Sequence, residues 1–344
     1  MPCPGPWKIV EASVPVAKPR ICVVGTGGTI ASRYDKKIGG HVSAATAQDL
    51  VAAVPELLEI ADIEVVEHSN INSALMDTPT AFGLRDTLRR VLADDSIAGV
   101  VVTHGTATLE ESAYLMDLTV GSDKPVVFTG AQRNADEKDP DGPRNILYAA
   151  MIASDPEARG RGVMVALGSQ IHAARDVTKI NPEVLTCFGA RDGGPIGAVS
   201  KYGASFFSMP QRRVHLEVDH VCDNVHIIRM GQGGNDLLFR ACIAGKVDGI
   251  VIEGTGGGNV NGPFYAGACA ALEAGIPVIA GLRLSSGAPH LGKGYPGSFQ
   301  SLQAKGAISS GYLSGIKARI LLMVALASTK EREQLKAIFK AAGG

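Results

Sequence analysis

The chain lacks an excess of charge of either sign. Its 344 residues carry 33 lysines and arginines against 34 aspartates and glutamates, a formal net charge of -1, with no basic block or stripe. Binding to nucleic acid requires a positive surface that neutralises phosphates. We therefore expect no nucleic-acid partner.

Long apolar runs are also missing. No stretch approaches the roughly 18 apolar residues of a membrane-spanning helix. Residues 1–19 contain prolines and scattered charges, but no continuous apolar segment typical of a secretory signal. We interpret residues 1–19 as a lead-in to the first strand. We expect a soluble, cytoplasmic protein without membrane contact.

Paired cysteines are absent as well. The six cysteines form no C-x-x-C pair, and several lie in apolar runs, so we expect buried, reduced thiols. His220, Cys222 and His226 are close in sequence, but their spacing matches no zinc-binding pattern. We expect no metal site.

Short apolar runs alternate along the chain with helical patterns. Runs rich in β-branched residues begin at Arg20, Ile63, Ala98, Lys124 and Gly162. They are apolar on both faces, as buried parallel strands are. Amphipathic stretches between them predict helices, for example over 45–60 and 78–94. This alternation predicts an α/β fold with a doubly wound, mainly parallel sheet.

The alternation fades and then resumes, which predicts two domains. Between residues 202 and 224 the periodicity indicates edge strands or a linker, and apolar runs separated by helical patterns return after it. We predict a larger N-terminal domain over 20–213, with a linker from about residue 202, and a smaller α/β domain over 214–344. Helices are expected in the smaller domain over 263–274 and 312–327.

Two glycine turns that carry threonines give the strongest chemical signal. GTGGT (25–29) follows the first predicted strand, and THGTAT (103–108) follows the third. Parallel strands end at one edge of a sheet, where ligands bind. The turns therefore place hydroxyls and free backbone N–H groups around one small volume. Acyl transfer through a hydroxyl nucleophile needs this arrangement, together with a base such as Lys179 or Tyr34.

A nucleotide site fits these turns poorly. A dinucleotide fingerprint would need its third glycine at Ile30 in the first turn and at Asn259 in the later EGTGGGNV segment. A phosphate loop needs Ser or Thr after its lysine, but Lys246 is followed by Val247. We therefore disfavour a nucleotide-linked oxidoreductase and expect no cofactor.

At these residues the chain resembles the bacterial-type L-asparaginase and glutaminase family of Thr-nucleophile amidohydrolases. TGGTIAS (26–32) and VVTHGTATLEESAYLMDLTV (101–120) are similar to its two signature motifs, and KPVVFTGAQR, DGPRNILYA, RDVTK and EGTGGGNV follow in family order. The resemblance extends from about residue 20 to 327. It implies a larger N-terminal and a smaller C-terminal α/β domain. It also implies homotetramers, built as dimers of intimate dimers with sites at the dimer seam.

The resemblance also implies roles for individual residues. Thr29 corresponds to the nucleophile, Thr106 to the second catalytic threonine, and Lys179 to its lysine partner. Ser73 corresponds to the serine that holds the substrate α-carboxylate. Asn259 corresponds to the asparagine that a neighbouring subunit contributes.

Two further family positions are harder to match. Tyr34 is our candidate for the mobile-loop tyrosine, although Gly40 or His41 falls nearer the usual spacing. The glutamate of the C-terminal domain has no clear counterpart between residues 292 and 306, where Gln300 lies.

One departure from the family concerns the substrate pocket, which we expect Gly28, Gly105, Ala74 and Ala107 to line together with Ser73. The family motif usually reads H-G-T-D-T, whereas this chain has alanine at 107. The missing aspartate normally binds the α-ammonium, and Ala74 stands where the family often has a polar residue. A buried ammonium without a counter-charge is costly, so the resemblance implies a pocket that has lost its ammonium site.

The leading hypothesis is an amidohydrolase. Thr29 attacks an amide carbonyl, ammonia or an amine leaves, and water hydrolyses the acyl-enzyme. L-asparagine is the family default, whereas an amide or lactam with a carboxylate but no free α-amine fits Ala107 better. Both substrates stay open. A non-catalytic ligand-binding homologue is the alternative, and the presence of Thr29, Thr106 and Lys179 argues against it.

Overall fold

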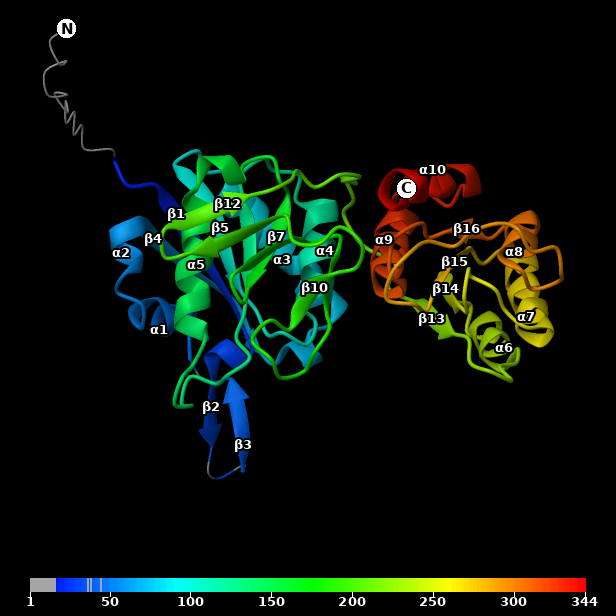
Figure 1. Ribbon diagram of the computed structural model, residues 1–344, viewed down its shortest axis with the longest axis horizontal. Coiled ribbons are helices and arrows are strands. Elements are labelled where there is room, and N and C mark those ends of the chain that lie inside the picture. The colour runs from blue at the N-terminus through cyan, green and yellow to red at the C-terminus, as the bar shows by residue number, and fades with distance from the viewer. Residues whose placement is uncertain (1–16, 36, 38, 44) are drawn as a thin grey trace, which may run out of the picture.

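The chain forms two α/β units of unequal size. A computed structural model describes residues 17–35, 37, 39–43 and 45–344, with the side chains of 33–35 and 41–43 outside the description. The larger unit holds the N-terminal half of the chain, and the smaller unit lies beside it (Figure 1). This confirms the predicted fold class, a large mainly parallel sheet followed by a smaller α/β unit.

The larger unit is built on an eight-stranded sheet. Its strands are β1 (Arg20–Gly27), β4 (Asp62–Ile71), β5 (Ile97–Thr103), β6 (Val126–Thr129), β7 (Val163–Leu167), β8 (Gln170–Ala173), β11 (Gly197–Ser200) and β12 (Gly203–Phe206). They are ordered β12-β11-β8-β7-β6-β5-β1-β4. The neighbours from β4 to β7 pair in parallel, whereas β7–β8, β8–β11 and β11–β12 pair antiparallel.

Helices cover both faces of this sheet. The helices are α1 (Ala47–Ala52), α2 (Leu57–Ile60), α3 (Thr78–Leu92), α4 (Leu109–Thr119) and α5 (Gly142–Ser154). Helices α1, α2 and α5 pack on one face, and α3 and α4 pack on the other. The central strands are therefore buried on both sides, as their apolar sequences predict.

Three local predictions were wrong, two in the kind or burial of an element and one in a helix boundary. The stretch 45–60 does not form one helix: Pro55 interrupts it, and the two short helices α1 and α2 result. Strand β4 is not buried on both faces, because it is the sheet edge and its residues are half-buried or exposed. The predicted helix over 312–327 begins instead at Gly315, because the Ser314 hydroxyl caps it by accepting from the Lys317 backbone N–H.

The smaller unit is a four-stranded parallel sheet, ordered β13-β14-β15-β16. Its strands are β13 (Val225–Arg229), β14 (Gly249–Gly254), β15 (Val278–Leu282) and β16 (Ile308–Ser309). Its helices are α6 (Leu237–Ala244), α7 (Gly262–Glu273), α8 (Phe299–Lys305), α9 (Gly315–Ser328) and α10 (Arg332–Gly343). Helix α9 packs across β13, β14 and β15, on the face that is turned toward the larger unit.

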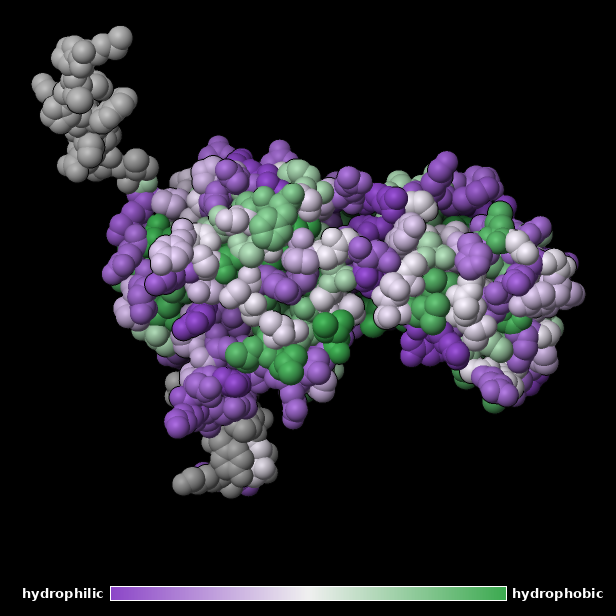
Figure 2. All heavy atoms as spheres, viewed as in Figure 1, coloured by the Kyte–Doolittle hydropathy of each residue, from purple (hydrophilic) through white to green (hydrophobic). Residues whose placement is uncertain are grey.

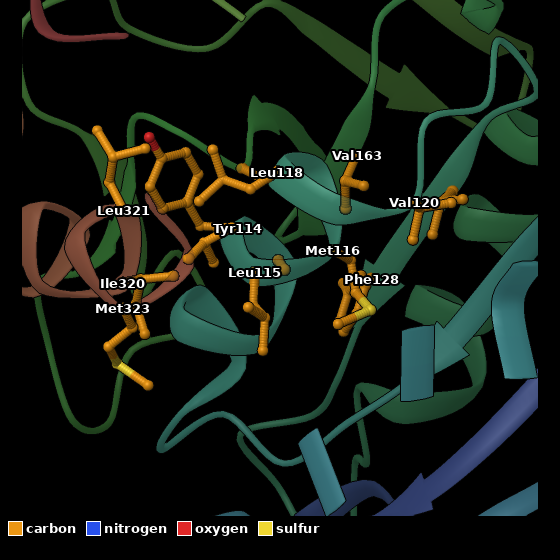
Figure 3. Close-up of a cluster of buried hydrophobic side chains, with 14 of the residues drawn as sticks. Tyr114, Leu115, Met116, Leu118, Val120, Phe128, Val163, Ile320, Leu321 and Met323 are labelled. Carbon is orange, nitrogen blue, oxygen red and sulfur yellow. The ribbon is translucent and has the colours of Figure 1, made fainter. Parts of the chain in front are cut away.

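One hydrophobic core crosses between the units. Helix α4 packs directly against α9. In Figure 3, Tyr114 and Leu115 of α4 lie beside Leu321 and Met323 of α9. The α4–α9 contact therefore fixes the smaller unit next to the turn that precedes α4.

The remaining elements are short. They are β2 (Ser32–Asp35) paired with β3 (Gly40–Ser43), β9 (Val177–Lys179) paired with β10 (Phe188–Ala190), and the 3-10 turns η1 (Thr29–Ala31), η2 (Ser73–Leu75) and η3 (Pro156–Ala158). Residues 207–224 connect the units without a helix or strand. In the described part of the chain, no helix is long and apolar enough to cross a membrane.

Candidate active site

Four neighbouring strands of the large sheet end beside one another. Strands β4, β1, β5 and β6 are consecutive and parallel. The segments that follow them carry Ser73, Thr29, Thr106 and Gln132, respectively. Because carboxyl ends of parallel strands share one sheet edge, side chains far apart in sequence converge there.

Two glycines bring the threonine turns into contact. Gly28 has a φ of 91°, and a Cβ added there would lie 2.2 Å from the Cα of Gly105. A Cβ added at Gly105 would lie 2.4 Å from the Ser73 Oγ and 2.9 Å from the Gly28 Cα. No side chain fits at either position. The turns that carry Thr29 and Ser73 are therefore held against the turn that carries Thr106.

The two threonines of the first turn differ in their surroundings. Thr26 is buried, and its hydroxyl donates to the Thr103 carbonyl at 2.9 Å, which ties β1 to β5. Thr29 opens the 3-10 turn and is half-buried, and its hydroxyl has no hydrogen-bond partner among the described residues. The Thr26 hydroxyl thus has a structural hydrogen bond, whereas the Thr29 hydroxyl makes none with another described residue.

Ser73 is held by two hydrogen bonds from the turn that carries Thr106. Its Oγ accepts from the Ala107 backbone N–H at 3.2 Å, and its carbonyl accepts from the Thr108 hydroxyl at 2.7 Å. The backbone N–H of Ala74 donates to the Asn72 side chain at 2.9 Å, which shapes the local 3-10 turn. Since the Ser73 Oγ already accepts from Ala107, its own proton stays free to donate to an anion.

Thr106, Lys179 and Gln132 form a closed hydrogen-bonded group. The Lys179 Nζ donates to the Thr106 Oγ1 at 2.7 Å and to the Gln132 Oε1 at 3.2 Å. The Thr106 hydroxyl donates to the same Gln132 oxygen at 3.0 Å. Thr106 is buried and Lys179 half-buried, so these bonds form with little competition from water.

Gln132 belongs to this candidate site, and the sequence analysis missed it. Its Nε2 donates to the Pro182 carbonyl at 2.7 Å, so its Oε1 faces Thr106 and Lys179. Its backbone N–H donates to the Asp141 carboxylate at 3.1 Å. The available signal was its place in KPVVFTGAQR, directly after a strand that neighbours β5.

His104 supports the second turn from inside the core. It is fully buried, and burial lowers the pKa of its imidazole to about 4. The ring is therefore neutral near pH 7, and its Nδ1 lies 2.8 Å from the Gly105 carbonyl. Because a carbonyl only accepts, this nitrogen carries the proton and donates it. His104 holds Gly105 in place.

Three further positions considered in the sequence analysis belong to other elements of the fold. Asn259 belongs to the smaller unit, in the turn after β14, and its Oδ1 accepts from the Phe299 backbone N–H at 3.1 Å. Gln300 is exposed, next to Phe299 in α8. Tyr34 lies in β2 opposite His41, and its side chain is outside the described part.

Comparison with known proteins assigns the family. The model of the N-terminal asparaginase domain matches residues 20–212, and that of the glutaminase/asparaginase C-terminal domain matches residues 224–339. L-asparaginase 2 of Bacillus subtilis (strain 168) is 33% identical over 344 aligned residues, covering 96% of this chain and 89% of that protein. L-asparaginase 2 of Escherichia coli (strain K12) is 33% identical, covering 94% and 93%.

A solved structure agrees. The crystal structure of a probable cytoplasmic L-asparaginase from Campylobacter jejuni superposes with a TM-score of 0.83 at 30% identity, covering 94% of this chain and 99% of that one. The family resemblance inferred from the sequence is thereby confirmed. This chain belongs to the bacterial-type L-asparaginase family and is an asparaginase-like hydrolase that acts on C–N amide bonds.

Proposed function

We propose that the enzyme hydrolyses a small carboxylate-bearing amide through an acyl-enzyme on Thr29. The observation that carries the proposal is the contact between the Thr29 turn and the turn of Thr106, whose hydroxyl is bonded to Lys179 and Gln132. The turn that carries the Thr29 hydroxyl thus packs against the turn of a buried hydroxyl that is bonded to a lysine. That combination suits nucleophilic acyl transfer.

The steps balance without a further reactant. The Thr29 oxygen bonds to the amide carbon, the C–N bond breaks, and the threonine proton leaves with the nitrogen as ammonia. Water then attacks the ester and returns a proton to Thr29, which releases the acid. We assign proton transfer in the second step to Thr106 and Lys179, with Gln132 fixing their orientation. Backbone N–H groups of the glycine turns suit the oxyanion.

Substrate binding is assigned to Ser73 and its surroundings. Its free hydroxyl proton suits a carboxylate, and Gly28, Gly105, Ala74 and Ala107 border that position.

Two substrates have separate support. L-asparagine is favoured by the names of the relatives. An amide without an α-amine is favoured by the alanines at 107 and 74, since neither methyl group compensates an ammonium ion.

We also propose a homotetramer in which Asn259 completes a neighbouring subunit's site. Apolar side chains next to the site residues support a covering partner: Leu75 is 75% exposed and Ile180 is 65% exposed. Figure 2 shows apolar patches, in green, among hydrophilic residues on the visible face. Light scattering during turnover checks this, and a fully active monomer would contradict it.

Cytoplasmic residence and a domain boundary at 213/214 also remain proposals. A cytoplasmic relative supports the first, although another relative is a probable periplasmic L-asparaginase. The gap between the two family matches, 212 to 224, supports the second. Fractionation of the source cells tests the location, and limited proteolysis tests the boundary.

Ammonia release from L-asparagine and from succinamate, its deamino analogue, tests the activity. Wild type should release ammonia from at least one, and Thr29→Ala should abolish release while leaving the thermal unfolding midpoint nearly unchanged. Binding without ammonia release would favour the ligand-binding alternative. A Thr29→Ala variant that keeps most of the rate would show that another residue is the nucleophile.

A further inference from the structure

A lysine of the smaller unit is buried against the larger one. Lys317, in the first turn of α9, is 1% exposed. Its Nζ donates to the Glu110 carbonyl at 2.5 Å and to the Ala174 carbonyl at 2.8 Å, and lies 5.3 Å from the Tyr114 ring centroid. Burial lowers its pKa to about 8, which leaves the ammonium form predominant at pH 7. Buried charges persist only with such partners.

The two carbonyls belong to the segments that carry Thr106 and Lys179. Glu110 lies in the first turn of α4, shortly after Thr106. Ala174 lies between β8 and β9, shortly before Lys179. The Lys317 ammonium group therefore bonds to both segments. The distance between these segments determines whether the Thr106 hydroxyl and the Lys179 Nζ lie within hydrogen-bonding distance.

Glu110 extends this link to the lysine itself. Its side chain is buried, and its Oε1 accepts from the Lys179 backbone N–H at 3.3 Å and from the Thr178 hydroxyl at 3.2 Å. Lys317 holds the backbone of Glu110, and Glu110 holds the backbone of Lys179. These contacts form a continuous path from α9 to the site.

The surroundings leave Lys317 little freedom. In Figure 3, Tyr114 of α4 lies beside Leu321 of α9, within the core shared by the two units. Next to Ala174, the Arg175 Nε donates to the Ala342 carbonyl of α10 at 2.7 Å. The segment before β9 is thus held by two helices of the smaller unit.

We propose that Lys317 is a positioning residue for catalysis, which holds the Thr106 and Lys179 segments at the spacing that their hydrogen bond requires. The inference rests on the proposed function, since it takes Thr106 and Lys179 as the working pair. It gives the smaller unit a role inside its own subunit's site, separate from the role of Asn259.

The test is Lys317→Met in the full-length enzyme, assayed with whichever of L-asparagine and succinamate wild type turns over faster. The kcat per folded molecule should fall at least roughly tenfold, with KM within about twofold of wild type, because the reacting groups lose alignment while Ser73 stays in place. Adding Lys317→Met to Lys179→Met should slow the enzyme no further, because both act through one group.

Leu322→Ala is the matched control. Leu322 is buried in the same helix, but its Cδ2 would lie 2.7 Å from a Cβ at Gly249 in β14 of its own unit. It should lower the unfolding midpoint and leave kcat unchanged. A folded Lys317→Met enzyme with wild-type kcat, an equal slowing by Leu322→Ala, or additive losses with Lys179→Met would each overturn the proposal.

Substitutions of Glu110 provide a second test of the proposal if Lys317→Met does not fold. Glu110→Ala should slow turnover, and Glu110→Gln should retain most of it, since an amide oxygen still accepts from the Lys179 N–H. Equal losses would overturn the proposal. Full turnover by Thr106→Ala and Lys179→Met would instead reject the proposed function. If Thr106→Ala and Lys179→Met are inactive but Lys317→Met and Glu110→Ala keep wild-type turnover, the role proposed for Lys317 is wrong and the proposed function stands.

Discussion

At the residue scale, we propose that Ala107 determines which substrate the pocket prefers. Its backbone N–H donates to Ser73, but its methyl group offers no charge to an ammonium. Ala107→Asp should strengthen L-asparagine turnover, because hydrogen bonds to charged groups contribute about 1.5 to 3 kcal/mol, or roughly ten- to a hundredfold. The same change should weaken succinamate turnover, because the new carboxylate is desolvated without a partner.

The measurement is kcat/KM for both compounds in wild type and variant. Opposite shifts support a pocket without an ammonium site. A wild type that already prefers L-asparagine strongly would mean that another residue supplies the charge.

We propose that the Gln132 side chain also affects the reaction, through its hydrogen bonds to Thr106 and Lys179. Gln132→Leu removes the oxygen shared by Thr106 and Lys179 and the donor to Pro182. We expect kcat to fall by about ten- to a hundredfold, as expected for loss of a hydrogen bond to a charged group. Steady-state kinetics measures it.

Arg133→Ala is the neighbouring control, because the Arg133 side chain bonds Asp139 at the exposed surface. It should leave kcat near wild type. Equal effects of the two substitutions would remove Gln132 from the site.

At the scale of elements, the site depends on two turns packed without side chains. Gly28→Ala adds a Cβ 2.2 Å from the Gly105 Cα, at a φ of 91° that side chains rarely adopt. The turns must separate, so we expect activity to fall by at least about a hundredfold and stability by on the order of 1 to 3 kcal/mol. Assay and thermal unfolding measure both.

Gly262 provides the comparison for that substitution, because a Cβ there meets nothing within 4 Å. Gly262→Ala should be close to neutral in both measurements. An active, stable Gly28→Ala enzyme would show that the turns do not need to touch.

At the scale of the whole molecule, buried histidines make stability depend on pH. Burial lowers the pKa of His104 and of His172 to about 4, below the ordinary value of 6.5. Between these values the unfolded chain binds a proton that the folded chain does not. Each histidine therefore contributes stability above pH 6.5 that is lost as pH falls toward 4, about 2 kcal/mol by pH 5.

Urea unfolding from pH 7.5 to 5 measures this loss. Burial raises the pKa of Asp117 and Glu111, which works in the opposite direction, so the comparison with His172→Gln isolates one histidine. The variant should lose about 2 kcal/mol less than wild type over this range. Parallel curves for the two proteins would contradict the assignment.

The local features of the fold were predictable because they depend on neighbours in sequence. Apolar β-branched runs specified β1, β5, β6 and β7, since buried strands need apolar residues on both faces. The GTGGT sequence indicated a turn at the end of the first strand, and its glycine spacing did not match a nucleotide-binding fingerprint. The helix break at Pro55 was also predictable from local sequence. The periodic apolar residues on both sides of Pro55 instead led us to predict one continuous helix.

The sequence by itself determined which residue types end each strand, and therefore that hydroxyls gather at one sheet edge. Tertiary structure alone decided which of them touch. Gln132 meets Thr106 and Lys179 because β5, β6 and the β9 hairpin are neighbours in space. Lys317 reaches Glu110 because α9 packs on α4. Hydrogen bonds act over about 3 Å and are indifferent to separation along the chain, so no local pattern encodes them.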